Sequence, residues 1–203
     1  MTASPPNLLA RADVLLCRHA PFARAMDAQG LLREAVDTQA DVLAERLAAQ
    51  LSRSGREMVL LCSPQERALA TIRPLATLLE LPVYTDPDLE ELRLGRDPRL
   101  SAADTAALWA AARAQPAAPA LPGAETLDAL TARALATLRA AVRAGNGRLV
   151  VAVSHGGLIE AVLRAADRAA KASPRARRIG FGEAAVLRLD PVTAPVVIRE
   201  PGA

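Results

Sequence analysis

The sequence predicts a three-layer α/β/α sandwich with a mainly parallel mixed sheet, built as one domain over residues 1–203. Strand-like apolar runs alternate with helical patterns along the chain, which is typical of this fold class. The first three runs show no polar and apolar alternation, so we expect a sheet that helices cover on both faces. An apolar content of 51% supplies a full hydrophobic core at this length.

Each element follows from a local pattern. Continuous apolar runs predict strands at 14–17, 59–62, 149–153, 184–189 and 196–198. Apolar residues at helical spacing predict helices at 36–51, 65–79, from SAAD (101–104) to about 114, at 127–142, and directly after His155. Gly145 and Gly147 are expected to end the fourth helix, and the proline-rich segment 115–124 is expected to be a loop or lid. Residues 1–12 are predicted to be a flexible N-terminal segment.

Composition narrows the function classes. No apolar run approaches the ~20 residues that span a bilayer, and the first residues lack the basic-then-apolar order of a secretion signal, so we expect a cytoplasmic protein with no membrane partner. Aromatic residues make up only 2% of the chain, which leaves no stacking surface for nucleic acid despite a formal charge of +3. Cys17 and Cys62 lie inside strand-like runs and are expected to be reduced, small apolar side chains.

Polar residues end the three central strands. Arg18 and His19 follow the first, Ser63 follows the second, and Ser154 and His155 end the third. Because ligands of such sheets bind beyond the carboxyl ends of the strands, these side chains are expected to converge on one crevice. Taken one at a time, each histidine is equally well explained by a local hydrogen bond at a strand end.

The residue types in this crevice favour an oxyanion ligand. The positive charge of Arg18 favours the neutral form of the His19 imidazole, which can attack phosphorus. His155 precedes two glycines and a helical run, and the N–H groups at a helix start favour an anion. Arg67 lies in the first turn of the helix after Ser63, where a lone arginine is usually a solvated cation. Beside Arg18, it adds a second guanidinium fork that matches phosphate oxygens.

The ordered motifs resemble those of the histidine phosphatase superfamily, which has the phosphoglycerate mutase-like fold. The resemblance runs from about residue 13 to about residue 190. The family's R-H-G motif is matched by RHA at 18–20, its S-x-x-x-R-A-x-x-T motif at 63–71, and its S-H-G-G motif at 154–157. The segment DLEELRLG at 88–95 resembles the family's acidic motif and selects Glu91, and PGAET at 122–126 resembles its G-G-E-S motif and selects Glu125.

The resemblance implies a role for each matched residue. His19 would be the nucleophile that becomes a phosphohistidine, and Glu91 would give a proton to the leaving oxygen. The phosphate oxygens would be held by cationic and helix-start groups, namely Arg18, Arg67, His155 and Gly156. Ser63 is placed on the substrate side. No metal and no cofactor are implied.

The roles of the acidic residues in these two motifs have alternatives. Glu90 competes with Glu91, because adjacent residues of an extended segment point in opposite directions. Both glutamates also fit a surface role in which they pair with Arg93 or Arg96. Glu125 fits either a carboxylate on the substrate side or an anion at the start of a helix.

The sequence departs from the family pattern beside the nucleophile. Ala20 replaces the usual glycine, and Phe22 stands where many relatives have a threonine that helps to bind the transferred group. Our hypothesis is that Arg24 substitutes for the missing hydrogen-bond donors.

Together these features predict a metal-independent phosphatase that hydrolyses small phosphomonoesters through a phosphohistidine, with a small phosphorylated metabolite as its partner. A mutase-type phosphotransferase is an alternative, although the segment after Glu91 does not reproduce the extra basic residues of the glycolytic mutases. A second alternative is a catalytically impaired protein that binds a phosphorylated ligand. A third is a zinc site of Cys17, Cys62, His19 and His155, which has poor support because no C-x-x-C or H-x-x-x-H pair occurs. The sequence leaves a homodimer open.

Overall fold

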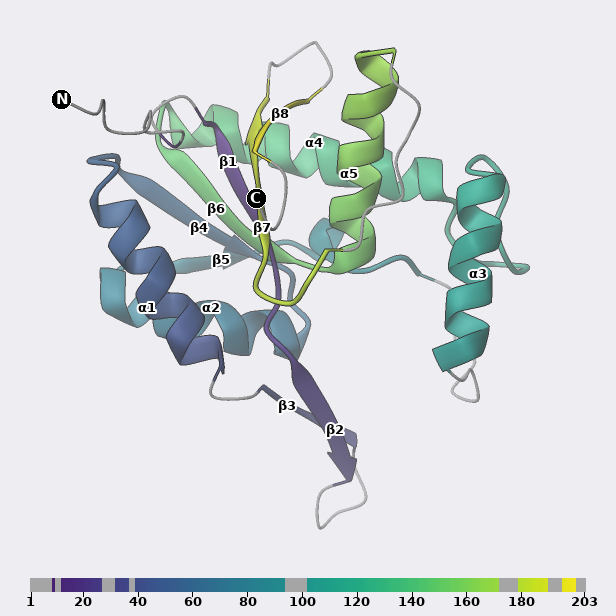
Figure 1. Ribbon diagram of the computed structural model, residues 1–203, viewed down its shortest axis with the longest axis horizontal. Helices are drawn as coiled ribbons and strands as arrows, with labels where there is room; N and C mark the ends of the chain where they lie inside the picture. The colour runs from purple at the N-terminus through teal and green to yellow at the C-terminus, as the bar shows by residue number, and fades with distance from the viewer. Residues whose placement is uncertain are drawn as a thin grey trace, which may run out of the picture.

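The described part of the chain has the α/β/α sandwich that the sequence predicts (Figure 1). The computed structural model describes residues 9, 12–26, 32–36, 39–93, 102–171, 179–189 and 195–199. Most of the N-terminal segment 1–12, and Arg96, lie outside the described residues. None of the helices in the described ranges is long and apolar enough to cross a membrane.

A six-stranded mixed sheet forms the middle layer. In spatial order its strands are β5 (Val83–Thr85), β4 (Met58–Cys62), β6 (Leu149–Ser154), β1 (Val14–Arg18), β7 (Ala184–Arg188) and β8 (Val196–Arg199). The first four strands are parallel to one another, and β7 pairs antiparallel with both β1 and β8. The carboxyl ends of β4, β6 and β1 therefore lie side by side at one edge of the sheet.

Helices cover both faces of this sheet (Figure 1). One face is covered by α1 (Gln39–Ser52) and α2 (Glu66–Leu79), and the other by α4 (Leu127–Gly145) and α5 (Gly156–Ala169). Helix α3 (Ala102–Ala114) stands to one side, beyond the start of α4. This arrangement leaves the carboxyl edge of the sheet between α2, α3 and the start of α5.

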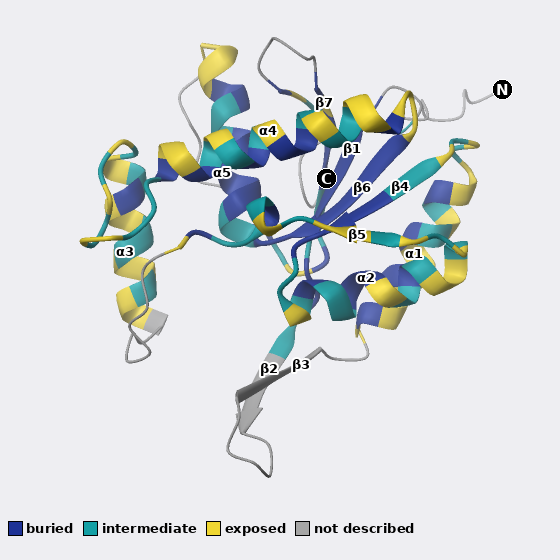
Figure 2. Cartoon of the chain, turned by 180° about the vertical axis from the view of Figure 1, so that it is seen from behind, coloured by how far each residue is buried: buried dark blue, intermediate teal, exposed yellow. Residues whose placement is uncertain are grey.

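The central strands contribute side chains to two hydrophobic cores. Along β1, Val14 and Leu16 pack with α4 and α5, whereas Leu15 and Cys17 pack with α1 and α2. All six residues of β6 are buried, as the dark central strands of Figure 2 show. A strand in this position must be apolar on both faces, which explains why the first three runs lack alternation.

The sequence analysis did not predict three of the strands in the described structure. β5 has only three residues, too few to leave a pattern. β2 (Phe22–Met26) and β3 (Leu32–Val36) pair as an antiparallel two-stranded sheet that extends away from the sandwich (Figure 1). The predicted helix start at Val36 is wrong, because Val36 pairs with Phe22 in this sheet and α1 begins at Gln39.

The ends of α4 follow the local sequence. The helix begins after Thr126, whose side chain accepts a hydrogen bond from the Ala129 N–H over 3.0 Å. It ends at Gly145, and the chain then turns through left-handed conformations at Asn146 (φ 47°) and Gly147 (φ 84°). The segment 115–124 before it contains no helix or strand, as its prolines predict.

Candidate active site

The polar residues that end the central strands lie together. β1 and β6 are parallel neighbours with Arg18 opposite Ser154, and β6 also pairs with β4. His19, His155 and Ser63 follow these strands at the same edge of the sheet, and the ring centroids of the two histidines are 5.3 Å apart. The carboxyl edge of the sheet thus brings both histidines of the chain together.

Hydrogen bonds fix the orientation of His19. Its Nδ1 lies 2.8 Å from the Ala20 carbonyl oxygen, which can only accept, so Nδ1 carries a hydrogen, and in the neutral imidazole the lone pair is on Nε2. The backbone N–H of His19 donates to the Ser154 carbonyl over 2.9 Å, which joins the end of β1 to the end of β6. The side chain is therefore held with its basic nitrogen turned away from its own backbone.

His155 is a fully buried, neutral imidazole. It is the N-cap of α5, and its Nε2 lies 2.8 Å from Ser63 Oγ. Burial, followed by the positive charge of Arg67 and other nearby groups, lowers the pKa of His155 to about 2. Its Nδ1 is buried and has no hydrogen-bond partner within the described structure. If Nδ1 carries the hydrogen of the ring, an oxyanion beside it would supply the missing hydrogen-bond acceptor.

Arg18 reaches across the start of α5. Its guanidinium carbon lies 3.8 Å from the centroid of the Phe181 ring, and its Nη1 donates to the Ile179 carbonyl. A Cβ added to Gly156 would stand only 3.2 Å from Arg18 Nε, so the glycine makes room for the guanidinium. Burial is the main reason that the pKa of Arg18 is lowered. Its Nε is buried without a hydrogen-bond partner in the described part of the chain, like Nδ1 of His155.

Helix α2 brings Arg67 to the same edge. The Arg67 guanidinium lies 5.1 Å from the centroid of the Phe22 ring and donates to the side-chain oxygen of Gln65. One turn later, Thr71 Oγ1 accepts the Ala20 N–H over 2.9 Å and donates to the Arg67 carbonyl over 2.7 Å. The S-x-x-x-R-A-x-x-T segment is thus bonded directly to the residue after the nucleophile candidate.

Glu91, and not Glu90, faces the site. The Glu91 carboxylate accepts the backbone N–H groups of Leu92 (3.0 Å) and Gly157 (3.1 Å). Burial raises the pKa of Glu91, although these two hydrogen bonds and the site arginines act to lower it. The Glu90 carboxylate instead lies 3.5 Å from Arg93 in a partly exposed ion pair. A carboxyl group that keeps its proton to a higher pH is suited to general acid chemistry.

Arg133 on α4 holds the segment that carries Glu91. It donates to the carbonyls of Asp88 (2.6 Å), Glu90 (2.9 Å) and Glu91 (3.2 Å). It also forms a two-point ion pair with Glu125, at 2.6 and 2.8 Å, in which both side chains are about nine-tenths buried. Burial would raise the pKa of Glu125, but the hydrogen bonds from Arg133 and from the Arg93 N–H, together with the charges of these two arginines, outweigh burial and lower that pKa. With its carboxylate so engaged just before α4, Glu125 fits the helix-start alternative, and its substrate-side role stays a prediction.

Two phenyl rings pack on the nucleophile candidate. The Phe22 and Phe181 centroids lie 5.2 and 5.4 Å from the His19 ring, and His19 is only 3% exposed. Arg24 lies on β2 opposite Glu34, and its side chain lies outside the described residues, so its expected role also stays a prediction.

The cysteines and the larger cavities lie elsewhere. Cys17 and Cys62 are buried in the core beneath α1 and α2, and burial raises the pKa of each thiol to about 12. Among the described residues, no group of three or more His, Cys, Asp or Glu side chains is arranged to hold a metal. The larger cavities, of about 420 and 600 Å³, are lined by neither histidine and by neither site arginine.

A comparison with protein-family profiles covers the residues of the candidate site. The profile of the histidine phosphatase superfamily (branch 1) matches residues 14–198, which contain every group described above. The chain belongs to the histidine phosphatase superfamily. No curated protein sequence matches it.

Solved structures share the fold of this superfamily member. YhfR of Bacillus stearothermophilus superposes with a TM-score of 0.69 at 18% identity, covering 91% of this chain and 94% of that one. A mycobacterial glucosyl-3-phosphoglycerate phosphatase, in complex with inorganic phosphate, gives 0.68 at 21% identity, with 94% and 95% covered. The alpha-ribazole phosphatase of Shigella flexneri gives 0.62 at 19% identity, with 94% and 96% covered. At these identities the likeness establishes the fold.

Sequence reasoning missed three residues near the candidate site. Arg133 comes eight residues after Glu125, about two helical turns, and that spacing is a usable signal for a contact between them. Trp109 packs so closely on α5 that a methyl group at Gly157 would overlap its indole ring, and the glycine pair alone gave no sign of this. Phe181 left no local signal, because it reaches His19 only through the pairing of β7 with β1.

Proposed function

We propose that the protein is a metal-independent phosphatase that hydrolyses small phosphomonoesters through a phosphohistidine at His19. The observation that carries the proposal is a pair of buried nitrogens without partners, Arg18 Nε and His155 Nδ1, beside a histidine whose Nε2 keeps its lone pair. Buried polar atoms are rarely left unsatisfied, and a phosphate group offers acceptors to both.

In the first step the Nε2 lone pair of His19 forms a bond to phosphorus, and the bond from phosphorus to the ester oxygen breaks. The ester oxygen takes the proton of Glu91 and leaves as an alcohol. Arg18, Arg67, His155 and the N–H of Gly156 hold the non-bridging oxygens and stabilise the charge of the transition state.

In the second step water attacks the phosphohistidine. Glu91, now ionised, accepts a proton from the water as the new oxygen–phosphorus bond forms. The bond between Nε2 and phosphorus breaks, its electrons return to His19, and orthophosphate leaves. Glu91 is protonated again, so the site returns to its starting state.

The test is phosphate release from a panel of phosphomonoesters in the presence of a chelator. We expect wild-type activity to survive chelation and His19→Ala to lower kcat by roughly 10³-fold or more, since the nucleophile is lost. His155→Asn is the matched control, because it alters the other histidine and keeps the nucleophile. Acid-labile phosphate should be trapped on wild type and on His155→Asn, and not on His19→Ala. Activity that the chelator abolishes, or trapping that persists in His19→Ala, would contradict the proposal.

One observation favours a second candidate, a protein that binds a phosphorylated ligand without turnover. The Phe22 and Phe181 rings pack on His19 and leave it 3% exposed. The trapping experiment separates the two candidates, because a pure binder forms no phosphohistidine.

A further inference from the structure

A small cavity of about 210 Å³ adjoins the candidate site on its α3 side. Arg18, Glu91, Gly156 and Gly157 form the wall that it shares with the site. Its outer wall consists of Trp109 and Arg113 on α3, Glu160 on α5, and Ile179. We call this cavity the Trp109 pocket. Because the acid candidate Glu91 lies at the junction, a group that leaves the phosphate would enter this space.

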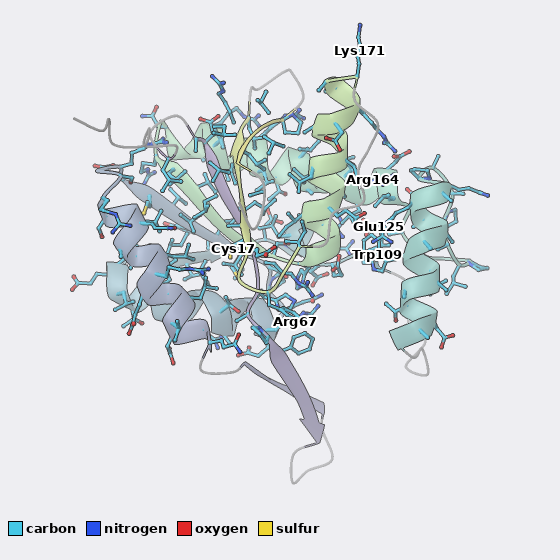
Figure 3. All side chains as sticks on the ribbon, viewed as in Figure 1. Cys17, Arg67, Trp109, Glu125, Arg164 and Lys171 are labelled. Carbon is cyan, nitrogen blue, oxygen red and sulfur yellow. The ribbon has the colours of Figure 1, made fainter. Side chains whose placement is uncertain are left out.

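The shape of the pocket is set by an aromatic wall. The indole of Trp109 is half-buried and lies so close to Gly157 that only a glycine fits there, and Figure 3 shows Trp109 between α3 and the foot of α5. A flat ring face of this kind suits an apolar or ring-shaped group. The volume lies below the roughly 300 Å³ at which pockets for drug-sized ligands begin, so the group must be compact.

The charge of the outer wall is already balanced. Arg113 Nε and Nη2 donate to the two carboxylate oxygens of Glu160, over 2.6 and 2.7 Å, and the Glu160 side chain is almost fully buried. The hydrogen bond that Arg113 donates to Glu160 is also the main reason that the pKa of Arg113 is raised. A carboxylate or phosphate entering the pocket would meet an arginine whose charge Glu160 has neutralised, and would approach two carboxyl groups, Glu160 and Glu91.

We infer that the Trp109 pocket binds the leaving group of the substrate and selects compact, uncharged alcohols, with Glu160 as the residue that sets this specificity. The inference deepens the proposed function and rests on it for the location of the phosphate. It disfavours substrates with a second anionic group, such as bisphosphates and phosphorylated carboxylic acids.

The first test uses the fluorescence of Trp109, the sole tryptophan of the chain. His19→Ala is titrated with phenyl phosphate, whose leaving group is uncharged, with 3-phosphoglycerate, whose leaving group is anionic, and with inorganic phosphate, which has none. We expect a saturable change with phenyl phosphate, at an at least tenfold lower concentration than with 3-phosphoglycerate, and little change with inorganic phosphate. Equal responses to the two esters, or no response to either, would overturn the inference.

The second test is a ratio of kcat/KM values, for phenyl phosphate over 3-phosphoglycerate. Glu160→Gln keeps the shape of the side chain and leaves the Arg113 charge unbalanced, so we expect the ratio to fall about tenfold. Glu66→Gln is the matched control, because it breaks an exposed glutamate–arginine pair with Arg73 on α2, outside the Trp109 pocket. A ratio that Glu160→Gln leaves unchanged would contradict the role of Glu160. If Glu160→Gln does not fold, the fluorescence titration still decides.

The two proposals fail in different ways. If the protein hydrolyses none of the esters but shows the expected Trp109 fluorescence response, the phosphatase proposal is refuted and the leaving-group pocket is supported. If hydrolysis depends on His19 but neither test shows a preference between the esters, the phosphatase proposal is supported and the leaving-group pocket is refuted.

Discussion

The two sides of the candidate site are built from different interactions. On the acid side, Glu91 is held by two backbone N–H groups, and the peptide that carries it is held by Arg133 through three carbonyls. On the histidine side, hydrogen bonds orient the backbone and the His19 Nδ1, but the ring itself packs against the phenyl groups of Phe22 and Phe181.

This difference indicates which side changes when a ligand binds. The acid side has its polar groups satisfied before any ligand arrives, so its geometry is fixed in advance. In the described structure the histidine side has two buried nitrogens without partners, Arg18 Nε and His155 Nδ1, and two aromatic rings packed on His19. We therefore expect ligand binding to displace the phenyl rings and to leave the Glu91 loop in place.

The largest effect is expected from the acid itself. Glu91→Gln removes the proton that the leaving oxygen needs and should lower kcat by roughly 10²- to 10⁴-fold for a substrate with a poorly stabilised alkoxide. The loss should shrink for an ester with an acidic leaving group, such as a nitrophenol, which leaves without protonation. Steady-state kinetics of wild type and Glu91→Gln on an alkyl ester and on a nitrophenyl ester measures the loss of kcat for each type of leaving group.

Glu90→Gln is the matched control for this substitution. Its carboxylate lies in a partly exposed pair with Arg93, so its loss should change kcat by less than about threefold. A larger loss in Glu90→Gln than in Glu91→Gln would show that the two residues had been assigned the wrong way round.

The next effect tests whether Arg133 fixes the acid. Arg133→Lys keeps a charge for Glu125 but has no fork to reach three carbonyls, so we expect kcat to fall roughly 10- to 100-fold with little change in KM. A looser, wetter Glu91 should also have a lower pKa, because burial is what raises it. The alkaline limb of the kcat profile, where Glu91 loses its proton, should therefore move to lower pH. A lower melting temperature with an unchanged pH profile would assign Arg133 a structural role only.

The sequence was a good guide to one side of this comparison and a poor one to the other. The strand ends are local signals, because apolar runs stop at Arg18, Ser63 and Ser154, and parallel pairing then brings them together. The position of Arg133 depends on how α4 packs against the loop before it. Its contacts with the segment that carries Glu91 are to backbone carbonyls, which carry no residue identity, and only its pair with Glu125 has a sequence signal. The phenyl cover depends on β2 and on the turn before β7, elements that only tertiary pairing defines.

The buried neutral histidine should make stability depend on pH. Because the folded-state pKa of His155 is lowered to about 2 and an unfolded histidine titrates near 6.5, the unfolded state binds more protons as the pH falls below about 6.5. This group alone should reduce the free energy of unfolding by about 1.4 kcal/mol between pH 7.5 and pH 5.5. Urea denaturation of wild type and of His155→Asn at both values measures it. Equal pH dependence in the two proteins would mean that His155 is not held neutral.

The smallest effect tests the phenyl cover directly. Phe22→Thr removes one of the two rings on His19 and supplies a hydroxyl at that position, so His19 should react with diethyl pyrocarbonate several-fold faster, while His155 stays unreactive because it is fully buried. Tyr84→Thr is the matched control, since it replaces an exposed aromatic residue on the edge strand β5. Vanadate should protect His19 in both wild type and Phe22→Thr if the ring only screens the site. If Phe22→Thr does not change the rate of modification, the cover comes from Phe181 and the loop that carries it, and the histidine side opens at β7 and not at β2.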